Sequence, residues 1–349
     1  MAIIGAGMSG VLMGVKLREA GFDDFAIYEK ADAVGGTWRD NRYPGLACDI
    51  PSRYYSYSFA PNPAWSRVFS SGSEILSYLE GIVRRYRLAP HIRLGQEVED
   101  ARYVDRAWQV RTGDSTTEFD FVVSACGILH HPRTPSIDGL EDFAGTSFHT
   151  ARWPADLDLA GKRVGIIGNG STGVQVIGSI AKEVGSLAVF QRTPHWIFPM
   201  PNPRYGPLGR FLVGRRPRLS KLAYRGYQEL YERILTRGMV EDGWQRSFVS
   251  WVSRQHMRVV RDPELRRRLT PSYPPMCKRL IVSTRFLPAM NRDNVELVSE
   301  PILRAESHGL RTQDSRLHEL DVLILATGFE AQAFMRPMAL TGEDGVELA

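Results

Sequence analysis

The 349-residue sequence contains few cysteines and no long apolar run. Cys48, Cys126 and Cys277 are far apart and form no C-x-x-C pair. An odd number of cysteines at such spacing argues against a disulfide framework, a structural zinc site and a dithiol redox centre. The sequence has neither about 18 consecutive apolar residues nor the basic leader of a signal peptide. We therefore expect no transmembrane helix and a cytoplasmic location.

Histidine motifs for metal binding are also missing. The eight histidines form no H-x-x-x-H or H-E-x-x-H pattern, and the neighbours His130 and His131 cannot easily converge on one ion. We predict no metal site.

Composition is ordinary for a folded protein, with 43% hydrophobic and 24% charged residues. Two domains are expected at this length, because single cores rarely grow beyond about 300 residues.

Positive charge is concentrated in one segment. Residues Gly209 to Arg237 hold eight Lys or Arg against two Glu, in a chain whose net charge is +5. Apolar residues recur there near helical spacing: Leu222, Tyr227, Leu230, Tyr231 and Ile234. We predict an amphipathic helix whose charged face is solvated while its apolar face packs on its own domain, with contact to a membrane surface as the alternative. No nucleic-acid-binding motif accompanies the basic residues, so nucleic acid is not an expected partner.

A glycine-rich turn follows the first apolar residues of the chain. The sequence GAGMSG, with Gly5, Gly7 and Gly10, comes directly after Ala2–Ile4, and the next apolar stretch, FAIYE, ends at Glu29. A strand, a tight turn and a helix in this order aim backbone N–H groups and the helix dipole at a pyrophosphate, while the acid accepts from ribose hydroxyls. The pattern predicts a dinucleotide site.

A second motif of the same type occurs after a strand expected at residues 164–167. It contains Gly168, Gly170 and Gly173 in the sequence GNGSTG. Arg192 follows Gly168 by the same 24 positions that separate Glu29 from Gly5 in the first motif. An acid at this position suits an unmodified ribose, whereas an arginine suits a 2′-phosphate. We predict FAD or NAD at the first site and NADP at the second.

Two similar apolar stretches, FDFVVSACG (119–127) and LDVLILATG (320–328), each end in Ala-x-Gly. They predict buried parallel strands, one in each nucleotide domain. The expected fold is α/β, with two Rossmann-like dinucleotide-binding domains and a helical insertion in the second. The expected domains are an FAD domain at 1–148, completed by 330–349 and a further C-terminal segment, and an NADP domain at 149–329 with its insertion at about 207–271.

A flavin site and an NADPH site in one chain predict a flavoprotein that takes hydride from NADPH, and without a dithiol or a metal the expected acceptor is O₂. The connector FAGTSFHTARWP matches the pattern F-x-G-x-x-x-H-x-x-x-W-P, with Phe143, Gly145, His149, Trp153 and Pro154 in place. The sequence is therefore similar to the type I Baeyer–Villiger monooxygenases of the flavin-containing monooxygenase superfamily. Further segments that resemble this family are GGTWRDNRYPGLACDIPSRYYSYSF (35–59), FQRTP (190–194) and DVLILATGF (321–329).

The resemblance implies that FAD, once reduced by NADPH, binds O₂ as a C4a-peroxyflavin whose peroxide attacks a ketone to give an ester or lactone. It implies that Arg279 supplies positive charge for this step and that Asp49 orients the guanidinium of Arg279. Lys278 and Arg192 would hold NADP, and His149 would be a hinge and cofactor contact, with a structural hydrogen bond as the alternative. The complete set of expected cofactor-binding residues is Gly5, Gly7, Gly10, Glu29, Gly36, Thr37, Trp38, Asp49, Tyr55, Val98, His149, Trp153, Gly168, Gly170, Ser171, Thr172, Gly173, Gln175, Arg192, Thr193 and Lys278.

Two positions depart from the family pattern. Cys126 stands where threonine is frequent, and Ala47 stands where many members have an arginine beside the cofactor. The alternatives are an N- or S-oxygenating flavin monooxygenase and, in another class, a non-catalytic NADPH-binding redox sensor or an inactive fragment. Only Ala2–Ile4 separate Met1 from the first glycine turn, and 20 residues follow Phe329. We therefore expect a chain truncated at both ends, whose FAD domain is open and holds FAD weakly.

Overall fold

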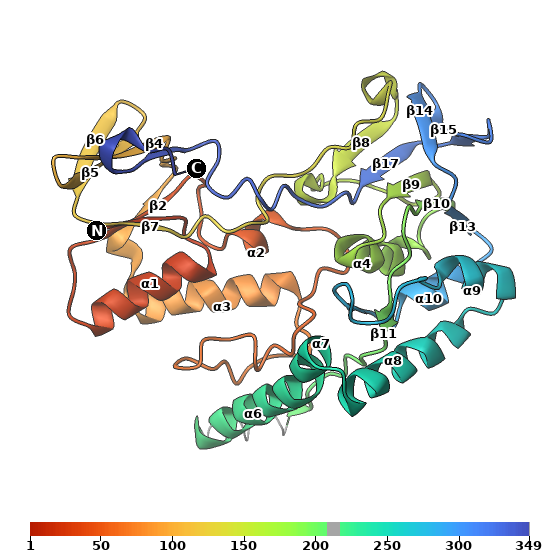
Figure 1. The fold of residues 1–349 in the computed structure, drawn as a ribbon, viewed down its shortest axis with the longest axis horizontal. Helices are drawn as coiled ribbons and strands as arrows, with labels where there is room; N and C mark the ends of the chain where they lie inside the picture. Colours follow the sequence, from red (N-terminus) through yellow and green to blue (C-terminus); the bar gives the residue numbers. More distant parts are fainter. Residues whose placement is uncertain (208–216, 349) are drawn as a thin grey trace. The chain divides into compact units, whose positions relative to one another are not determined.

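The computed structural model describes residues 1–207 and 217–348. The chain forms two compact units: the first comprises Met1–Asn41, Gly72–Arg133 and Phe329–Ala349, and the second comprises Arg42–Ser71 and Thr134–Gly328 (Figure 1). These boundaries differ from the expected division near residue 148. In particular, the segment expected beside the flavin is divided, because its residues from Arg42 onward belong to the second unit.

The first unit contains a parallel sheet with the strand order β3-β2-β1-β7. Its strands are β1 (Ala2–Ile4), β2 (Ala26–Glu29), β3 (Ile92–Leu94) and β7 (Val122–Ser124). The helices of this unit are α1 (Met8–Glu19), α2 (Thr37–Asp40), α3 (Gly72–Arg85) and the 3-10 turns η1 (Ala89–His91) and η6 (Glu343–Gly345). Figure 1 shows α1 and α3 side by side along one face of the sheet.

A second sheet of the same unit has the order β18-β4-β5-β6. It consists of the antiparallel strands β4 (Asp100–Val104), β5 (Ala107–Thr112) and β6 (Ser115–Phe119), with β18 (Ala339–Thr341) parallel to β4. Ile4 and Tyr28 from the parallel sheet share a hydrophobic core with Val98, Val110 and Met338. The two sheets of the unit are therefore joined by burial of apolar side chains.

Helix α1 approaches the parallel sheet closely because its inner face is small. Gly10, Val11, Gly14 and Val15 are its buried residues, and positions four apart lie on one face of a helix. A Cβ at Gly14 would come within 2.9 Å of the Ile27 side chain. This close contact positions the N-terminus of α1 at the end of β1.

The second unit is built on a five-stranded parallel sheet with the order β13-β10-β9-β17-β8. Its strands are β8 (Thr146–His149), β9 (Arg163–Ile167), β10 (Ser186–Phe190), β13 (Val295–Val298) and β17 (Val322–Leu325). All four residues of β17 are buried, as expected for a strand covered on both faces. The connector FAGTSFHTARWP is thus no free linker, because part of it forms the edge strand β8.

Smaller elements surround this sheet. Helices α4 (Ser171–Ile180) and α10 (Phe286–Met290) pack into one core with its central strands. The remaining elements are the pair β11 (Ile197–Phe198) and β12 (Ile281–Val282), the antiparallel strands β14 (Ile302–Glu306), β15 (Gly309–Thr312) and β16 (Leu317–Glu319), and the turns η2 (Leu140–Asp142) and η3 (Thr150–Arg152).

Helices also fill the expected insertion. They are α6 (Pro217–Leu230), the π-helical turn η4 (Tyr231–Thr236), α7 (Arg237–Val240), α8 (Trp244–His256), the 3-10 turn η5 (Met257–Val259) and α9 (Pro263–Leu269). The beginning of the expected insertion, residues 208–216, lies outside the described residues. Over the rest, the predicted helical insertion is present.

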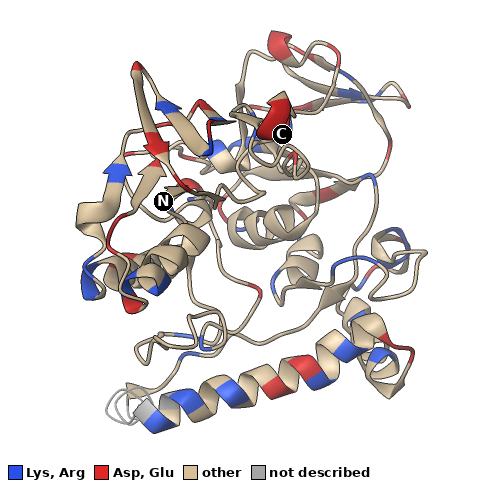
Figure 2. Ribbon diagram, turned by 60° about the vertical axis from the view of Figure 1, so that its left-hand side comes forward, with Lys and Arg blue, Asp and Glu red and all other residues tan. Residues whose placement is uncertain are grey.

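The basic segment predicted at residues 209–237 forms α6 and η4 where it is described, and its first eight residues lie outside the described residues. Figure 2 shows Lys and Arg recurring along this helix. The Tyr227 hydroxyl lies 3.2 Å from the Tyr205 hydroxyl, and the Tyr231 hydroxyl donates to the sulfur of Met200 at 3.2 Å. The aromatic side of the helix therefore packs within its own unit.

Residues 1–207 and 217–348 contain neither a candidate membrane-spanning helix nor a candidate metal site. No helix in these ranges is both long and apolar enough to cross a membrane. The same residues contain no group of three or more His, Cys, Asp or Glu side chains arranged to hold a metal ion.

Candidate functional site

The first glycine turn joins β1 to α1. Gly5 has a φ of +104°, and a Cβ there would lie 2.7 Å from the carbonyl oxygen of Ala125, which follows β7. A Cβ at Gly10 would collide with the Gly5 carbonyl. Both glycines are therefore required for the turn to pass between β7 and the helix.

Gly7 leaves room above this turn. A Cβ at Gly7 would meet only Gly36 Cα, at 3.7 Å, so the backbone is open to a ligand. Helix α1 has no side-chain cap and no acidic residue in its first turn. Its first N–H groups and its dipole thus suit an anion such as a pyrophosphate. Thr37 and Trp38 begin α2 directly after Gly36, so the predicted GGTW segment lies at the same turn.

Glu29 ends β2 as predicted, and its carboxylate binds the turn itself. Oε2 accepts from the N–H of Ala6 at 2.9 Å, Oε1 accepts from the N–H of Ala31 at 3.1 Å, and Arg39 lies 3.1 Å from Oε1. The side chain is only 6% exposed. A ribose would have to share this carboxylate with three protein donors. The side chain of Val98, another predicted contact, lies in the core, which leaves only its backbone for a cofactor.

The second glycine turn joins β9 to α4 and repeats the geometry of the first. Gly168 has a φ of +105°, and a Cβ there would lie 2.5 Å from the carbonyl oxygen of Ala326, which follows β17. A Cβ at Gly173 would collide with the Gly168 carbonyl, whereas one at Gly170 would meet no described atom within 4 Å. Ser171 and Thr172 begin α4, which has no acidic residue in its first turn. The two Ala-x-Gly stretches thus play equivalent parts in both units.

Arg192 follows β10 at the edge of this second turn. The neighbouring Gln191 is fixed by two hydrogen bonds, since Asn169 donates to its Oε1 at 2.6 Å and its Nε2 donates to the Arg268 carbonyl at 3.1 Å. Arg192 itself is exposed and forms no ion pair in the part of the chain that the structure describes. Thr193 is the next residue along this loop. The guanidinium of Arg192 is thus available for a phosphate.

Lys278 lies in the neighbourhood of the same loop. The Tyr273 hydroxyl donates to the Pro194 carbonyl of this loop at 3.1 Å. Burial lowers the pKa of His195, and the charge of Lys278 lowers it further. Its Nζ also lies 4.8 Å from the ring centroid of Tyr273. Lys278 and Arg192 are therefore two cations near the loop that follows β10.

Asp49 and Arg279 form an ion pair. Nη2 of Arg279 donates to Oδ2 of Asp49 at 2.5 Å. The aspartate side chain is 20% exposed and the arginine side chain 70% exposed. The two residues that the resemblance assigned to catalysis are thus in contact, with the guanidinium extending toward the surface.

The loop that carries Asp49 is attached to α4. Tyr43 donates from its hydroxyl to Gln175 Oε1 at 3.2 Å, and Gln175 Nε2 donates to the Ala47 carbonyl at 2.9 Å. Gly45 has a φ of +83°, and a Cβ there would lie 2.7 Å from the Gln175 carbonyl and collide with Ser179. Gln175, predicted as a cofactor contact, holds this loop in the structure. Sequence reasoning missed Tyr43 and Gly45, although Pro-Gly in NRYPG is a recognisable turn signal.

A tyrosine cluster lies on the other side of this loop. Tyr54 contacts Tyr224 and Tyr231, with ring centroids 5.5 and 6.1 Å apart. Burial raises the pKa of Tyr231, and the charge of Asp49 raises it further. Helix α6 and turn η4 therefore pack near the Asp49 segment, a relation that the sequence did not predict. Tyr55, a predicted cofactor contact, donates its backbone N–H to the Pro51 carbonyl at 2.8 Å in the same segment.

His149 ends β8 and contacts β17 and η3. Its Nδ1 accepts from the N–H of Ala151 at 3.1 Å, so its Nε2 carries the proton and donates to the Gly328 carbonyl at 2.9 Å. Trp153 packs edge to face on Phe148, with the centroids 5.1 Å apart. His149 thus has the structural hydrogen bond that we gave as the alternative, while its contact with a cofactor stays a prediction.

The two glycine turns define a dinucleotide-binding oxidoreductase with two Rossmann-type sheets. Residues 2–206 match the family model described as pyridine nucleotide-disulphide oxidoreductase. An uncharacterized monooxygenase of Mycobacterium tuberculosis is 52% identical over 350 aligned residues, which cover 100% of this chain and 70% of that protein. A Baeyer–Villiger monooxygenase of Streptomyces coelicolor is 39% identical and is matched over 100% of this chain and 68% of its own length.

A solved structure gives the same result. The crystal structure of OTEMO in complex with FAD and NADP matches with a TM-score of 0.88 and 31% identity, over 99% of this chain and 73% of that one. This chain belongs to the Baeyer–Villiger monooxygenases, the FAD- and NADPH-dependent flavin monooxygenases that insert oxygen into ketones. The resemblance seen in the sequence, the predicted fold class and the two predicted cofactors are thereby confirmed. The roles of individual site residues stay predictions.

Proposed function

We propose that this chain inserts one oxygen atom of O₂ into a ketone, with FAD in the first unit, NADPH in the second and Arg279 as the cation at the reacting oxygen. The observation that carries this assignment is the ion pair between Asp49 and Arg279. A redox sensor that only binds NADPH has no need of a guanidinium held in a fixed direction.

The first unit fits FAD. The open backbone at Gly7 and the uncapped start of α1 suit the pyrophosphate, and Glu29 would share its carboxylate between its protein donors and the adenosine ribose. The second unit fits NADPH in the same way through Gly170 and the start of α4. Arg192 and Lys278 would bind the 2′-phosphate as a bidentate partner and a point charge. When bound, NADPH supplies the hydride and FAD supplies the reaction with O₂.

Arg279 would stabilise negative charge that develops on oxygen during the transfer. A fixed cation acts most strongly when it does not have to reorganise as charge develops. Asp49 restricts the guanidinium by its hydrogen bond, and Gln175 and Tyr43 in turn restrict the loop of Asp49. At position 47, where many members of the family have an arginine, this chain has an alanine. We therefore assign the positive charge beside Asp49 to Arg279.

Two further assignments belong to this proposal. A cytoplasmic location is supported by the free thiols of Cys48, Cys126 and Cys277, which a reducing compartment preserves. Burial raises the pKa of the Cys48 thiol to about 12, so this cysteine beside Asp49 stays protonated. The basic helix is assigned a packing role, and its contact with a membrane surface remains the alternative.

Product analysis under ¹⁸O₂ tests the function. The protein is supplied with FAD and NADPH and with cyclic, open-chain and aryl ketones, and the products are identified by mass spectrometry. We expect an ester or lactone that carries one ¹⁸O atom. Oxides of amines or sulfides without any ester would instead establish the N- or S-oxygenating alternative. Absence of NADPH consumption with every ketone and with FAD bound would contradict an enzymatic function.

A further inference from the structure

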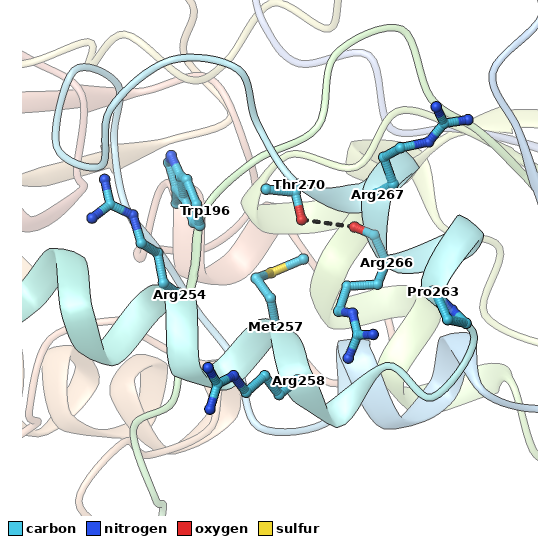
Figure 3. Close-up of a pocket in the computed structure, with 8 residues that line it drawn as sticks. All are labelled: Trp196, Arg254, Met257, Arg258, Pro263, Arg266, Arg267 and Thr270. Carbon is cyan, nitrogen blue, oxygen red and sulfur yellow. Dashed lines mark hydrogen bonds between the residues drawn. The ribbon is translucent and has the colours of Figure 1, made fainter.

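An open pocket of about 690 Å³ lies among the helices of the second unit, a size typical of small-molecule sites. It is lined by residues from α8, η5, α9 and the loop after β10: Trp196, Arg254, Met257, Arg258, Pro263, Arg266, Arg267 and Thr270 (Figure 3). Residues 192, 193 and 278, which we assign to the NADP phosphate, are not among them. The pocket is therefore distinct from the nucleotide contacts described above.

The ionisable side chains of this lining are all basic. Four of the eight residues are arginines and none is acidic. Arg267 is paired with Glu264 at 2.6 Å, but the side chains of Arg254, Arg258 and Arg266 form no ion pair or hydrogen bond among residues 1–207 and 217–348. Arg254 and Arg258 are also four positions apart on one helical run, where like charges repel.

The two acids at the start of α9 contact groups other than Arg254, Arg258 and Arg266. Asp262 caps α9 by accepting from the N–H of Leu265 at 2.6 Å, and Glu264 pairs with Arg267. Several other arginines of the same unit do form ion pairs, as Arg163 does with Asp321 and Arg311 does with Glu306. Arginines around one pocket that lack carboxylate partners are free to take an external anion, which guanidinium groups bind through paired hydrogen bonds.

The floor of the pocket is apolar and rigid. Trp196 is 5% exposed and Met257 is 3% exposed. The indole N–H of Trp196 donates to the Tyr273 carbonyl at 2.7 Å, which fixes the ring. Figure 3 shows Met257 between the helix of Arg254 and Arg258 and the short helix of Arg266. A ligand held here would place its charge at the arginines and an apolar body over the small exposed parts of the tryptophan and the thioether.

We propose that this pocket binds an organic anion with an apolar body, such as an alkyl or aryl carboxylate, sulfonate or phosphate ester. Arg254, Arg258 and Arg266 bind the anionic group, and Trp196, Met257 and Pro263 contact the apolar part. The site is separate from the ketone oxidation and does not depend on it. A bare anion such as inorganic phosphate lacks the apolar contacts and binds more weakly.

Calorimetric titration of the full chain with decanoate, decyltrimethylammonium and inorganic phosphate tests the site. Decanoate is expected to bind with one-to-one stoichiometry, and both other probes at least tenfold more weakly. Saturating NADPH is expected to leave decanoate binding unchanged. Equal binding of the cationic probe, binding of phosphate as tight as that of decanoate, or displacement by NADPH would each overturn the proposal.

Matched variants locate the binding. Arg258→Gln and Arg266→Gln are each expected to weaken decanoate binding by about tenfold, the scale of one charge-assisted contact. Arg261→Gln is the control, because Arg261 is exposed in the same segment but does not line the pocket. It is expected to change binding less than about twofold. Equal effects of all three variants, or no effect of the first two, would show that the pocket does not bind the carboxylate.

Discussion

Arg279 donates a hydrogen bond from Nη2 to Oδ2 of Asp49, although 230 positions separate them in the sequence. Asp49 is mostly buried and its loop is held by Gln175 of α4, whereas Arg279 is 70% exposed. The carboxylate therefore fixes the direction of the guanidinium, and not the reverse. An ion pair with one partner so exposed adds little to stability, about 0–1 kcal/mol. Its function is expected to be in the reaction.

Arg279→Ala is expected to lower ester formation by about 10²- to 10³-fold, the scale for losing one fixed donor to a developing oxyanion. The melting temperature and the visible flavin spectrum should change little, because the side chain is largely exposed. Gas chromatography of the products and a thermal melt measure the two effects. Arg285→Ala removes an exposed charge from the same stretch and should leave turnover unchanged. Wild-type ester formation by Arg279→Ala would remove Arg279 from the mechanism.

Asp49→Asn tests whether the aspartate acts through the arginine. The amide keeps the shape of the side chain but loses the charge that orients Arg279. We expect a smaller loss of turnover than for Arg279→Ala, and no further loss when both changes are combined, because residues that act as one unit are not additive. Turnover numbers of the wild type, the two single variants and the double variant complete a double-mutant cycle. Additive losses would show that Asp49 acts independently of Arg279.

Arg192→Ala tests the choice between the two nicotinamide cofactors. Loss of a charge-assisted contact with the 2′-phosphate should weaken NADPH binding by about 1–3 kcal/mol. Binding of NADH serves as the internal control, since it lacks that phosphate and should be little affected. Dissociation constants from quenching of tryptophan fluorescence provide the measurement. An equal loss for both cofactors would contradict the assignment of Arg192.

The two nucleotide folds could be predicted because their signals are local. Gly5 and Gly168 occupy turns that need positive φ and close approach to a neighbouring strand, and both demands leave a glycine in the sequence. Glu29 and Arg192 have opposite charges, and each lies 24 positions after the first glycine of its turn. Such features depend on a short stretch of chain and are visible without the rest of the structure.

The surroundings of Asp49 could not be predicted, because they depend on contacts between distant segments. Nothing local in Tyr43 or Tyr54 indicates that the first bonds to Gln175 and the second packs on Tyr231. The same reason explains why residues 42–71 join the second unit, although their neighbours on both sides belong to the first. The pairing of Asp49 with Arg279 came from family resemblance and not from spacing.

Gly45→Ala tests the attachment of the Asp49 loop to α4. Gly45 has a φ of +83°, and an added Cβ would collide with Ser179 and approach the Gln175 carbonyl to 2.7 Å. We expect a loss of about 1–3 kcal/mol in stability together with lower turnover, because the loop must shift. Gly161→Ala is the matched control, with a φ of +68° but no atom within 4 Å of the added Cβ. Similar effects of both variants would show that backbone strain alone is responsible.

The His149 hydrogen bonds predict how stability depends on pH. Burial lowers the pKa of His149 below its ordinary value of 6.5, and the nearby Arg152 lowers it further. A histidine with a lowered pKa in the folded state contributes stability that is present above the unfolded pKa and is lost as pH falls through the folded pKa. Protonation of Nδ1 removes the acceptor of the Ala151 N–H, which gives the physical reason.

We therefore expect the difference in melting temperature between the wild type and His149→Gln to be largest near about pH 8 and to shrink as the pH falls below 6.5. Other histidines contribute to the absolute melting curve, so the difference between the two proteins is the quantity to measure, by scanning calorimetry. His308→Gln, which changes an exposed histidine of the same unit, should show no such trend. A difference that stays constant over this range would mean that the bond from the Ala151 N–H to a neutral imidazole does not contribute to stability.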